Sequence, residues 1–300
     1  MHSNFAIITT ILAEIALALH PILIKEVPST LTSQLLARLG TYGTLSLALA
    51  SPDERNETWG SVSSAGSSIA LGLMNIVHIA SSYISYALLP AGSALALFYT
   101  FPFMNILAGA LFLGDTISWW MLPLMLVAFA GVLLIAQSTR ESEVEEPAMK
   151  SDTQFKGVGW GVAMALISAL TETLIFLVAK VPRQGHSPWL SMSRMYPGAL
   201  LALVAWIVTT GRFSELAIPG ASWAKLLGFN ILVGFIGYSL RFFSIPLLPT
   251  AIFSILTFIG VVAGYGWGMI FANEIPKMTS LIGAGLITGS LGVLQGFGLQ

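Results

Sequence analysis

The chain has 300 residues, of which 55% are hydrophobic and 9% are charged, and its formal net charge is −1. A soluble domain carries about 25% charged residues, so most of this surface does not face water, and lipid is the expected surrounding. The charge balance excludes the basic patch that a nucleic-acid partner needs, and the absence of cysteine excludes disulfides and thiolate metal sites.

Apolar runs of about 20 residues, the length that crosses a bilayer core, recur along the chain and predict about ten membrane-spanning helices. The first five are expected near residues 4–25, 31–50, 64–87, 91–113 and 118–137. The second five are expected near residues 157–180, 188–210, 223–246, 250–272 and 278–298. The predicted fold class is therefore an all-α, polytopic membrane protein, located in a plasma or inner membrane or in a eukaryotic organelle membrane.

The first span is expected to be retained as a helix, with a cleaved signal peptide as the alternative. No basic region precedes it, and Glu14 interrupts the apolar run that a signal peptide would need.

A charged stretch at residues 140–156 separates the two sets of spans and, with Pro147, is typical of a flexible linker. It divides the chain into a first five-helix repeat, residues 1–139, and a second, residues 157–300. An odd number of spans in each half would place the halves in opposite orientations. Many secondary transporters are built from such inverted repeats, with the solute site between the halves.

Matched landmarks in the two halves support the repeat. Leu88-Leu89-Pro90 resembles Leu247-Leu248-Pro249, at an offset of 159 residues. The same offset places Asp115 on Glu274, and each of these acidic residues follows a long apolar span.

Short motifs in the fourth, fifth and tenth spans carry a family resemblance. Small residues open the fourth span, Phe101-Pro102 lies within it, and Leu113-Gly114-Asp115 closes it. Gly131-Val132-Leu133-Leu134 ends the fifth span, and Gly292-Val293-Leu294 repeats this motif in the tenth. The pattern resembles the drug/metabolite transporter superfamily, specifically its ten-helix EamA-like exporters. The resemblance implies alternating access, with a cavity lined by helices 1, 3, 4, 6, 8 and 9.

The sequence departs from the family pattern at two of these motifs. Asp115 stands where the family usually has Glu, and Val261 stands where the second copy of the motif would have its proline. The resemblance also implies that both termini are cytoplasmic. The distribution of Lys and Arg between the loops favours the reverse orientation, so both orientations stay open.

Charged residues inside the predicted spans are the main candidates for function, because a charge at mid-bilayer costs ~2.5–3.5 kcal/mol and usually faces protein or a water-filled cavity. Glu14 and Glu172 are candidates for solute binding or proton coupling. For Glu14 the resemblance adds weight, since small four-helix multidrug members of the superfamily carry a similar glutamate. Arg241 is a candidate for binding a carboxylate or phosphate bidentately. The alternative for these residues is a structural ion pair, such as Glu172 with Arg241.

Arg38 and Arg194 lie at similar depths near the starts of equivalent spans, where an arginine can snorkel to the interface. We interpret both as structural or gating residues. Pro102, in the middle of the fourth span, predicts a kink that can open a cavity or act as a hinge.

Polar and aromatic residues in the spans supply further candidates for the solute site. His78 lies mid-span, where the alternative is a buried histidine with satisfied hydrogen bonds. Tyr83, Tyr99 and Tyr238 are candidates for lining a cavity that holds a flat or amphipathic solute.

Glycines spaced four residues apart predict close helix packing in the last two spans. The glycines concerned are Gly260, Gly264 and Gly268 in the ninth span and Gly285, Gly289, Gly292 and Gly296, with similar spacing, in the tenth. Gly264 is also a structural or gating candidate.

The predicted function is a secondary transporter that moves a small organic solute by alternating access. The excess of intramembrane arginines over glutamates favours an anionic or zwitterionic solute, such as an amino acid or organic acid. We find no His-Glu-x-x-His, Gly-x-Ser-x-Gly or paired catalytic aspartates, so an enzyme, a cofactor and a metal are not expected. A channel or lipid scramblase is the alternative. The expected partners are the solute, the bilayer and a coupling proton or ion; no oligomer is required.

Overall fold

The computed structural model describes residues 2–89, 91–116, 119–140, 157–181, 187–271 and 277–297. This part of the chain is helical and contains no β-strand. Residues 141–156 of the predicted linker, Pro90 and the landmark Glu274 lie outside the described residues.

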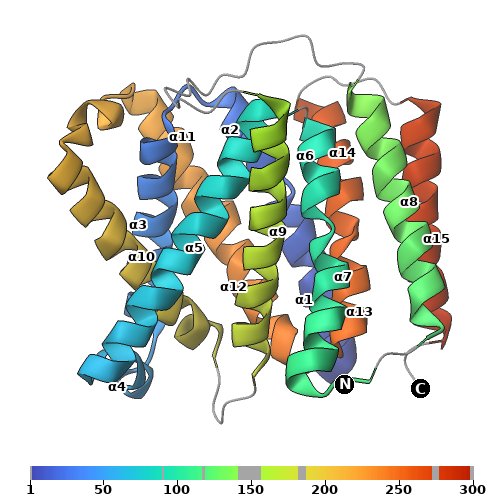
Figure 1. The fold of residues 1–300 in the computed structure, drawn as a ribbon, viewed down its shortest axis with the longest axis horizontal. Coiled ribbons are helices and arrows are strands. Elements are labelled where there is room, and N and C mark those ends of the chain that lie inside the picture. Colours follow the sequence, from blue (N-terminus) through green and yellow to red (C-terminus); the bar gives the residue numbers. More distant parts are fainter. Residues whose placement is uncertain are drawn as a thin grey trace.

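Seven described helical segments are long and apolar enough to cross a membrane. They are Asn4–Leu23, Val62–Leu88, Ala94–Leu113, Val158–Lys180, Pro188–Thr210, Gly220–Leu247 and Thr250–Phe271. Two shorter apolar helices, Met121–Gln137 and Met278–Val293, and the more polar α3 (Leu31–Leu49) run beside them (Figure 1). The prediction of a multi-pass α-helical membrane protein is confirmed, and α10 (Pro188–Thr210) has the bounds that we expected.

The first and fourth spans are interrupted where proline enters the next helix. The first span divides into α1 (His2–Leu17) and α2 (His20–Glu26), with Pro21 in the first turn of α2. The fourth divides into α6 (Ala91–Phe98) and α7 (Phe101–Ala108), and a π-helical turn, η1 (Gly109–Leu113), completes it. Proline has no N–H to donate and is tolerated in the first turn of a helix. The predicted kink at Pro102 is therefore confirmed as a break just before it.

The eighth and ninth spans are also irregular, and their breaks have no proline except Pro246 in the first turn of η4. The eighth consists of α11 (Gly220–Phe229), a π-helical turn, α12 (Ile236–Ser244) and a 3₁₀ turn η4 (Ile245–Leu247). The ninth divides at Phe258 into α13 (Thr250–Thr257) and α14 (Ile259–Phe271). Breaks inside spans free backbone groups and let side chains from short helices converge.

The remaining long helices are α5 (Val62–Leu88), α8 (Met121–Arg140), α9 (Val158–Lys180) and α15 (Met278–Phe297). Spans in equivalent positions of the two predicted halves run in opposite directions: in Figure 1, α1 rises and α9 descends, whereas α3 descends and α10 rises.

Helix contacts also fall into reciprocal pairs. Helix α5 packs on α9 and α1 packs on α12, while α6 and α7 pack on α9 and both α13 and α14 pack on α1. Two halves related by an approximate two-fold axis would make such contacts. The division into five-helix repeats stays a prediction.

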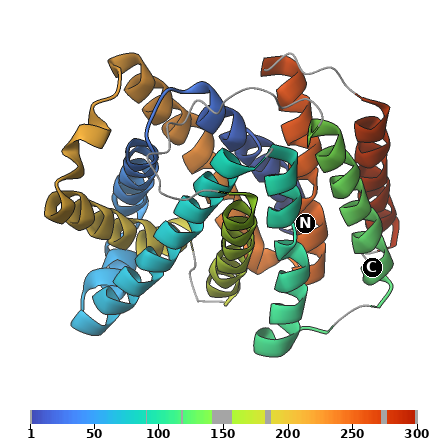
Figure 2. The same cartoon turned by 45° about the horizontal axis from the view of Figure 1, so that its top comes forward.

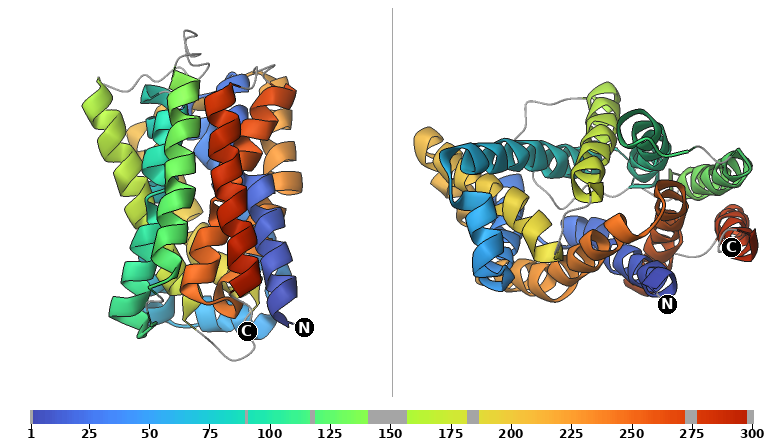
Figure 3. Two further views of the ribbon diagram at one scale, coloured as in Figure 1. Left: turned by 90° about the vertical axis from the view of Figure 1, so that its right-hand side faces the viewer. Right: turned by 90° about the horizontal axis from the view of Figure 1, so that it is seen from below.

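Helices α8 and α15 form a pair at one edge of the bundle (Figures 2 and 3). Their backbones meet at Gly131 and Gly283, where a Cβ on Gly283 would lie 2.6 Å from the carbonyl oxygen of Gly131. The predicted close packing of the glycines in the tenth span is wrong for three of them, since a Cβ on Gly285, Gly289 or Gly292 would meet nothing within 4 Å.

The short helix α4 (Pro52–Trp59) was not expected, because it is polar and only eight residues long. Ser51 and Glu54 form a capping box at its start. The Glu54 carboxylate also accepts a hydrogen bond from Ser187, the N-cap of α10, so α4 is attached to the start of that helix.

Candidate functional site

Four titratable side chains from four helices meet in the interior of the bundle. Arg241 on α12 lies 3.4 Å from Glu14 on α1, between Nη1 and Oε1, and 2.5 Å from Glu172 on α9, between Nη2 and Oε1. Nε2 of His78 on α5 lies 3.2 Å from Oε2 of Glu172. All four side chains are buried. The structure thus brings together four of the predicted site residues, which we call the charged cluster.

The two glutamates of the charged cluster are held differently. Glu172 makes a short ion pair with Arg241 and a second contact with His78. Glu14 makes only the longer contact, and its Oε1 accepts no hydrogen bond from any described residue. Glu14 is therefore the less tightly held carboxylate.

His78 is oriented by α9. Its Nδ1 lies 3.1 Å from the carbonyl oxygen of Ser168 and 3.3 Å from the hydroxyl of Thr171. A carbonyl oxygen only accepts hydrogen bonds, so the contact with Ser168 is a hydrogen bond when Nδ1 carries the proton. In that tautomer a neutral His78 has an unprotonated Nε2, which faces a carboxylate oxygen of Glu172. The His78–Glu172 contact becomes a hydrogen bond when one further proton binds to either residue.

Broken helices place aromatic rings around Arg241. Phe101, the first residue of α7, lies with its ring centroid 5.4 Å from the Arg241 guanidinium carbon, and Phe253 on α13 lies at 5.7 Å. Ring faces at this distance attract a cation, the more so away from water. The breaks at Thr100 and Phe258 thus allow two short helices to approach the charged cluster.

Gly260 on α14 makes room for two predicted site residues. A Cβ at this position would collide with the hydroxyl of Tyr99 and would lie 3.1 Å from Oε2 of Glu14. The predicted close packing therefore holds for Gly260. At Gly264 the nearest atoms, both of Ala18, would lie at an ordinary 3.8 Å, so that position does not require glycine.

Arg38 on α3 lies in a second buried centre, surrounded by tyrosines. Its guanidinium carbon is 4.8 Å from the ring centroid of Tyr238, 5.5 Å from that of Tyr42 and 5.9 Å from that of Tyr83. Tyr196 completes the group, with its ring 5.0 Å from Tyr42 and 6.3 Å from Tyr238. We call these four tyrosines the tyrosine cage.

Arg38 is only 4% exposed and does not snorkel to an interface. Among the described residues it has no carboxylate within ion-pair distance, and Nη1 donates one long hydrogen bond, of 3.4 Å, to the hydroxyl of Tyr83. Arg194, its predicted counterpart, is half-buried on α10, so the two arginines have different surroundings.

Tyr238 connects the tyrosine cage with the charged cluster. It lies on α12 three residues before Arg241, so the two side chains are neighbours on one helix face. The ring of His20 makes an edge contact with Tyr238, at 6.4 Å between centroids.

Sequence reasoning missed Tyr42, Tyr196, Phe101 and Phe253. The spacing of Tyr42 four residues after Arg38 on one helix was a usable signal. The other three come to the site from distant segments, and no local pattern marks them.

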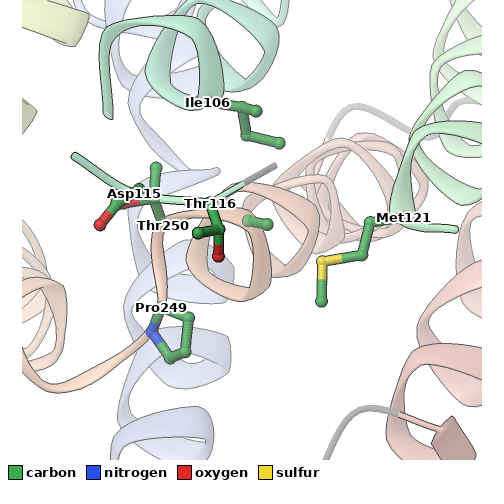
Figure 4. Close-up of a pocket in the computed structure, with 7 residues that line it drawn as sticks. Ile106, Asp115, Thr116, Met121, Pro249 and Thr250 are labelled. Atoms are coloured by element: carbon green, nitrogen blue, oxygen red, sulfur yellow. The ribbon is translucent and has the colours of Figure 1, made fainter. Parts of the chain in front are cut away.

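A small pocket of about 190 Å³ lies apart from both centres, where η1 ends and α13 begins (Figure 4). Its lining residues are Ile106, Asp115, Thr116, Met121, Pro249, Thr250 and Ala251. Asp115 accepts a hydrogen bond from the hydroxyl of Thr250 across it. Ligand pockets usually measure ~300–1,000 Å³, so we assign this pocket to helix-end contacts rather than to the solute.

Within the described ranges, no group of three or more His, Asp or Glu side chains is placed to hold a metal ion.

Comparison with known proteins points to one transporter family. The EamA-like transporter family matches residues 159–295. Two relatives, both the pseudopaline exporter CntI of Pseudomonas aeruginosa, from strains UCBPP-PA14 and PAO1, are each 25% identical over 223 residues, which is 72% of this chain and 70% of the exporter. A solved protein crystal structure has a TM-score of 0.65 at 15% identity and covers 97% of this chain and 96% of its own, which shows likeness of fold alone. The chain is a multi-pass membrane protein whose residues 159–295 match the EamA-like transporter family.

Proposed function

We propose that this protein is a secondary transporter that moves a small anionic or zwitterionic organic solute by alternating access. The charged cluster carries the proposal. Ionisable groups at membrane depth are costly, and they mark solute and ion pathways or proton relays. A purely structural role would be served at lower cost by apolar residues, since replacing a buried ion pair with well-packed apolar side chains is often neutral or stabilising.

The origin of the cluster residues supports a site between two moving halves. Glu14 and His78 come from the first predicted half, and Glu172 and Arg241 come from the second. A rocking motion of one half against the other would separate Glu14 from Arg241 and His78 from Glu172. Substrate and ion sites of inverted-repeat transporters lie at such an interface, among interrupted helices.

The His78–Glu172 contact supports proton coupling. One proton converts this contact into a hydrogen bond, so the bound proton and the closed interface stabilise each other. The likeness to an exporter supports export as the direction of transport.

The test is counterflow in proteoliposomes that contain the purified protein, with amino acids and organic acids as probes and with an imposed pH gradient. We expect saturable counterflow for at least one class. Arg241→Lys should lower it strongly, because an ammonium cannot reproduce the bidentate geometry of a guanidinium. Arg212→Lys is the matched control, since the Arg212 side chain is 49% exposed. Absence of counterflow for every class would overturn the proposal, and flux that rises linearly with concentration would favour the channel or scramblase.

A further inference from the structure

We propose that Arg38 and the tyrosine cage form the subsite that binds the carboxylate of a zwitterionic solute, whose ammonium group faces the charged cluster. The inference rests on the proposed transport function and names its substrate class. It also assigns Arg38 a binding role, where the sequence suggested a structural or gating one.

One edge of the Arg38 guanidinium is only weakly satisfied by the protein. Its Nε and Nη2 have no hydrogen bond of normal length among the residues that the structure describes, and the hydroxyls of Tyr196 and Tyr238 lie near enough to the guanidinium for weak ones. These two nitrogens form the side edge of the guanidinium, which binds the two oxygens of a carboxylate in parallel. Buried polar groups are nearly always paired, and an unpaired buried charge is costly. This weakly satisfied edge of Arg38 therefore matches one carboxylate.

Other unsatisfied polar atoms lie around the same centre. The hydroxyl of Tyr42 and Nε2 of His20 also lack partners in the described part of the chain. Both residues contact Tyr238, whose ring faces Arg38. A polar group of a bound solute would supply the hydrogen-bond partners that these atoms lack in the protein.

Charge is distributed unevenly between the charged cluster and the tyrosine cage. Both buried glutamates contact Arg241, and neither contacts Arg38. With both glutamates ionised, the charged cluster has one surplus negative charge and the tyrosine cage has one surplus positive charge. A solute with one carboxylate and one ammonium group complements both centres at once. A dicarboxylate would place its second negative charge beside the surplus carboxylate, where like charges repel.

The two centres are adjacent in the fold, so that one small molecule could bridge them. Tyr238 and Arg241 are neighbours on one face of α12, and the ring of Tyr238 lies 4.8 Å from the Arg38 guanidinium carbon. Glu14, the more loosely held carboxylate, contacts Arg241 at 3.4 Å and can exchange this long contact for an ammonium group. The faces of the cage tyrosines also attract an ammonium group that passes them.

The test compares solutes that differ only in the carboxylate. Proteoliposomes with the full chain are assayed for counterflow of the L-amino acids, of their C-terminal amides and of the corresponding decarboxylated amines. The variants are Arg38→Gln, Arg38→Lys and the control Arg212→Gln. Arg212 is a matched control because it also lies over an aromatic ring, 5.0 Å from Trp206, but on the surface.

We expect the wild type and Arg212→Gln to carry at least one amino acid and to prefer it to its amide by about tenfold or more, the size of a charge-assisted hydrogen-bond pair. Arg38→Gln should remove this preference by lowering amino-acid transport while leaving amide transport unchanged. Arg38→Lys should keep part of the preference, because a point charge remains. Size-exclusion profiles show whether each variant folds. If Arg38→Gln does not fold, the ratio of amino-acid to amide transport in Arg38→Lys tests the inference: a ratio as high as that of the wild type would overturn it.

The outcomes separate this inference from the proposed function. If the wild type carries amino acids and Arg38→Gln keeps the preference for the carboxylate, the inference is overturned and the transport function stands. If the wild type carries simple carboxylic acids but no amino acid, the inference is likewise overturned and the transport function stands. Absence of counterflow for every probe overturns both.

Discussion

Loss of charge at the two buried glutamates should change stability by very different amounts. Glu172→Gln leaves the 3.4 Å contact to Glu14 as the remaining ion pair of Arg241 in the charged cluster and removes the negative charge that faces His78. Removing one partner of a buried pair typically costs ~3–5 kcal/mol, because the other charge stays buried and less well compensated. Since the Glu172 contact is the short one, at 2.5 Å, we expect the free energy of unfolding to fall by an amount in this range.

Glu14→Gln should cost little stability or none. Arg241 keeps its short contact with Glu172, and the change removes one of two negative charges that share one guanidinium. The lost attraction at 3.4 Å is then offset by the relief of repulsion between the carboxylates. We expect this variant to lie within about 1 kcal/mol of the wild type, as weak ion pairs do, while losing solute-coupled transport.

Thermal unfolding of the purified protein in detergent measures the contrast. The wild type and Glu14→Gln should unfold at similar temperatures, and Glu172→Gln should unfold several degrees lower. Equal destabilisation by both variants would refute the reasoning, since the shorter and the longer ion pair of Arg241 would then contribute equally to stability. A larger effect of Glu14→Gln would refute it as well.

Further predictions concern helix packing and one exposed carboxylate. Gly260→Val should abolish transport, because its side chain would occupy the space of a tyrosine hydroxyl and a cluster carboxylate, whereas Gly264→Ala should transport normally; equal counterflow would contradict this. Gly283→Leu should destabilise the contact of α15 with α8, by roughly 1–3 kcal/mol for overpacking, and Gly289→Leu should not; unfolding temperatures decide. Partial burial acts to raise the pKa of Glu54, but hydrogen bonds from two serines outweigh it and hold that pKa below its usual range. A depressed pKa stabilises the folded state above the unfolded value, and this contribution is lost as the pH falls through the folded value. Fluorescence of the tryptophan that ends α4 should therefore distinguish Glu54→Gln from the wild type at pH 7, and the difference should shrink as the pH falls below the ordinary glutamate pKa of about 4.3 and vanish below the folded value; a difference that does not shrink in acid would contradict the assignment.

The helices could be predicted because each needs only a local apolar run. The site could be predicted residue by residue, since Glu14, His78, Glu172 and Arg241 each stand out inside apolar spans. Their pairing could not, because it depends on how helices distant in sequence pack together. Two members of the tyrosine cage, Tyr42 and Tyr196, were missed for the same reason: a tyrosine inside a span is ordinary until a guanidinium is placed against its ring.

The glycine pattern shows a different limit of sequence reasoning. Regular spacing of small residues indicates a smooth helix face but does not say what covers it. Gly283, which lies outside the noted spacing, packs against α8, while Gly285 and Gly289 face open space.

The division of charge between Arg38 and the charged cluster also has an electrical consequence. With both glutamates ionised and His78 neutral, the two arginines and two glutamates of the interior have no net charge. A zwitterion adds none when it binds. Membrane voltage acts on net charge, at about 2.3 kcal/mol per elementary charge for each 100 mV, so it would neither drive nor oppose the movement of the loaded site. A proton bound by the charged cluster, by Glu14 or between His78 and Glu172, would then be the voltage-sensitive cargo. The dependence of transport on voltage would therefore give the number of protons carried with each solute.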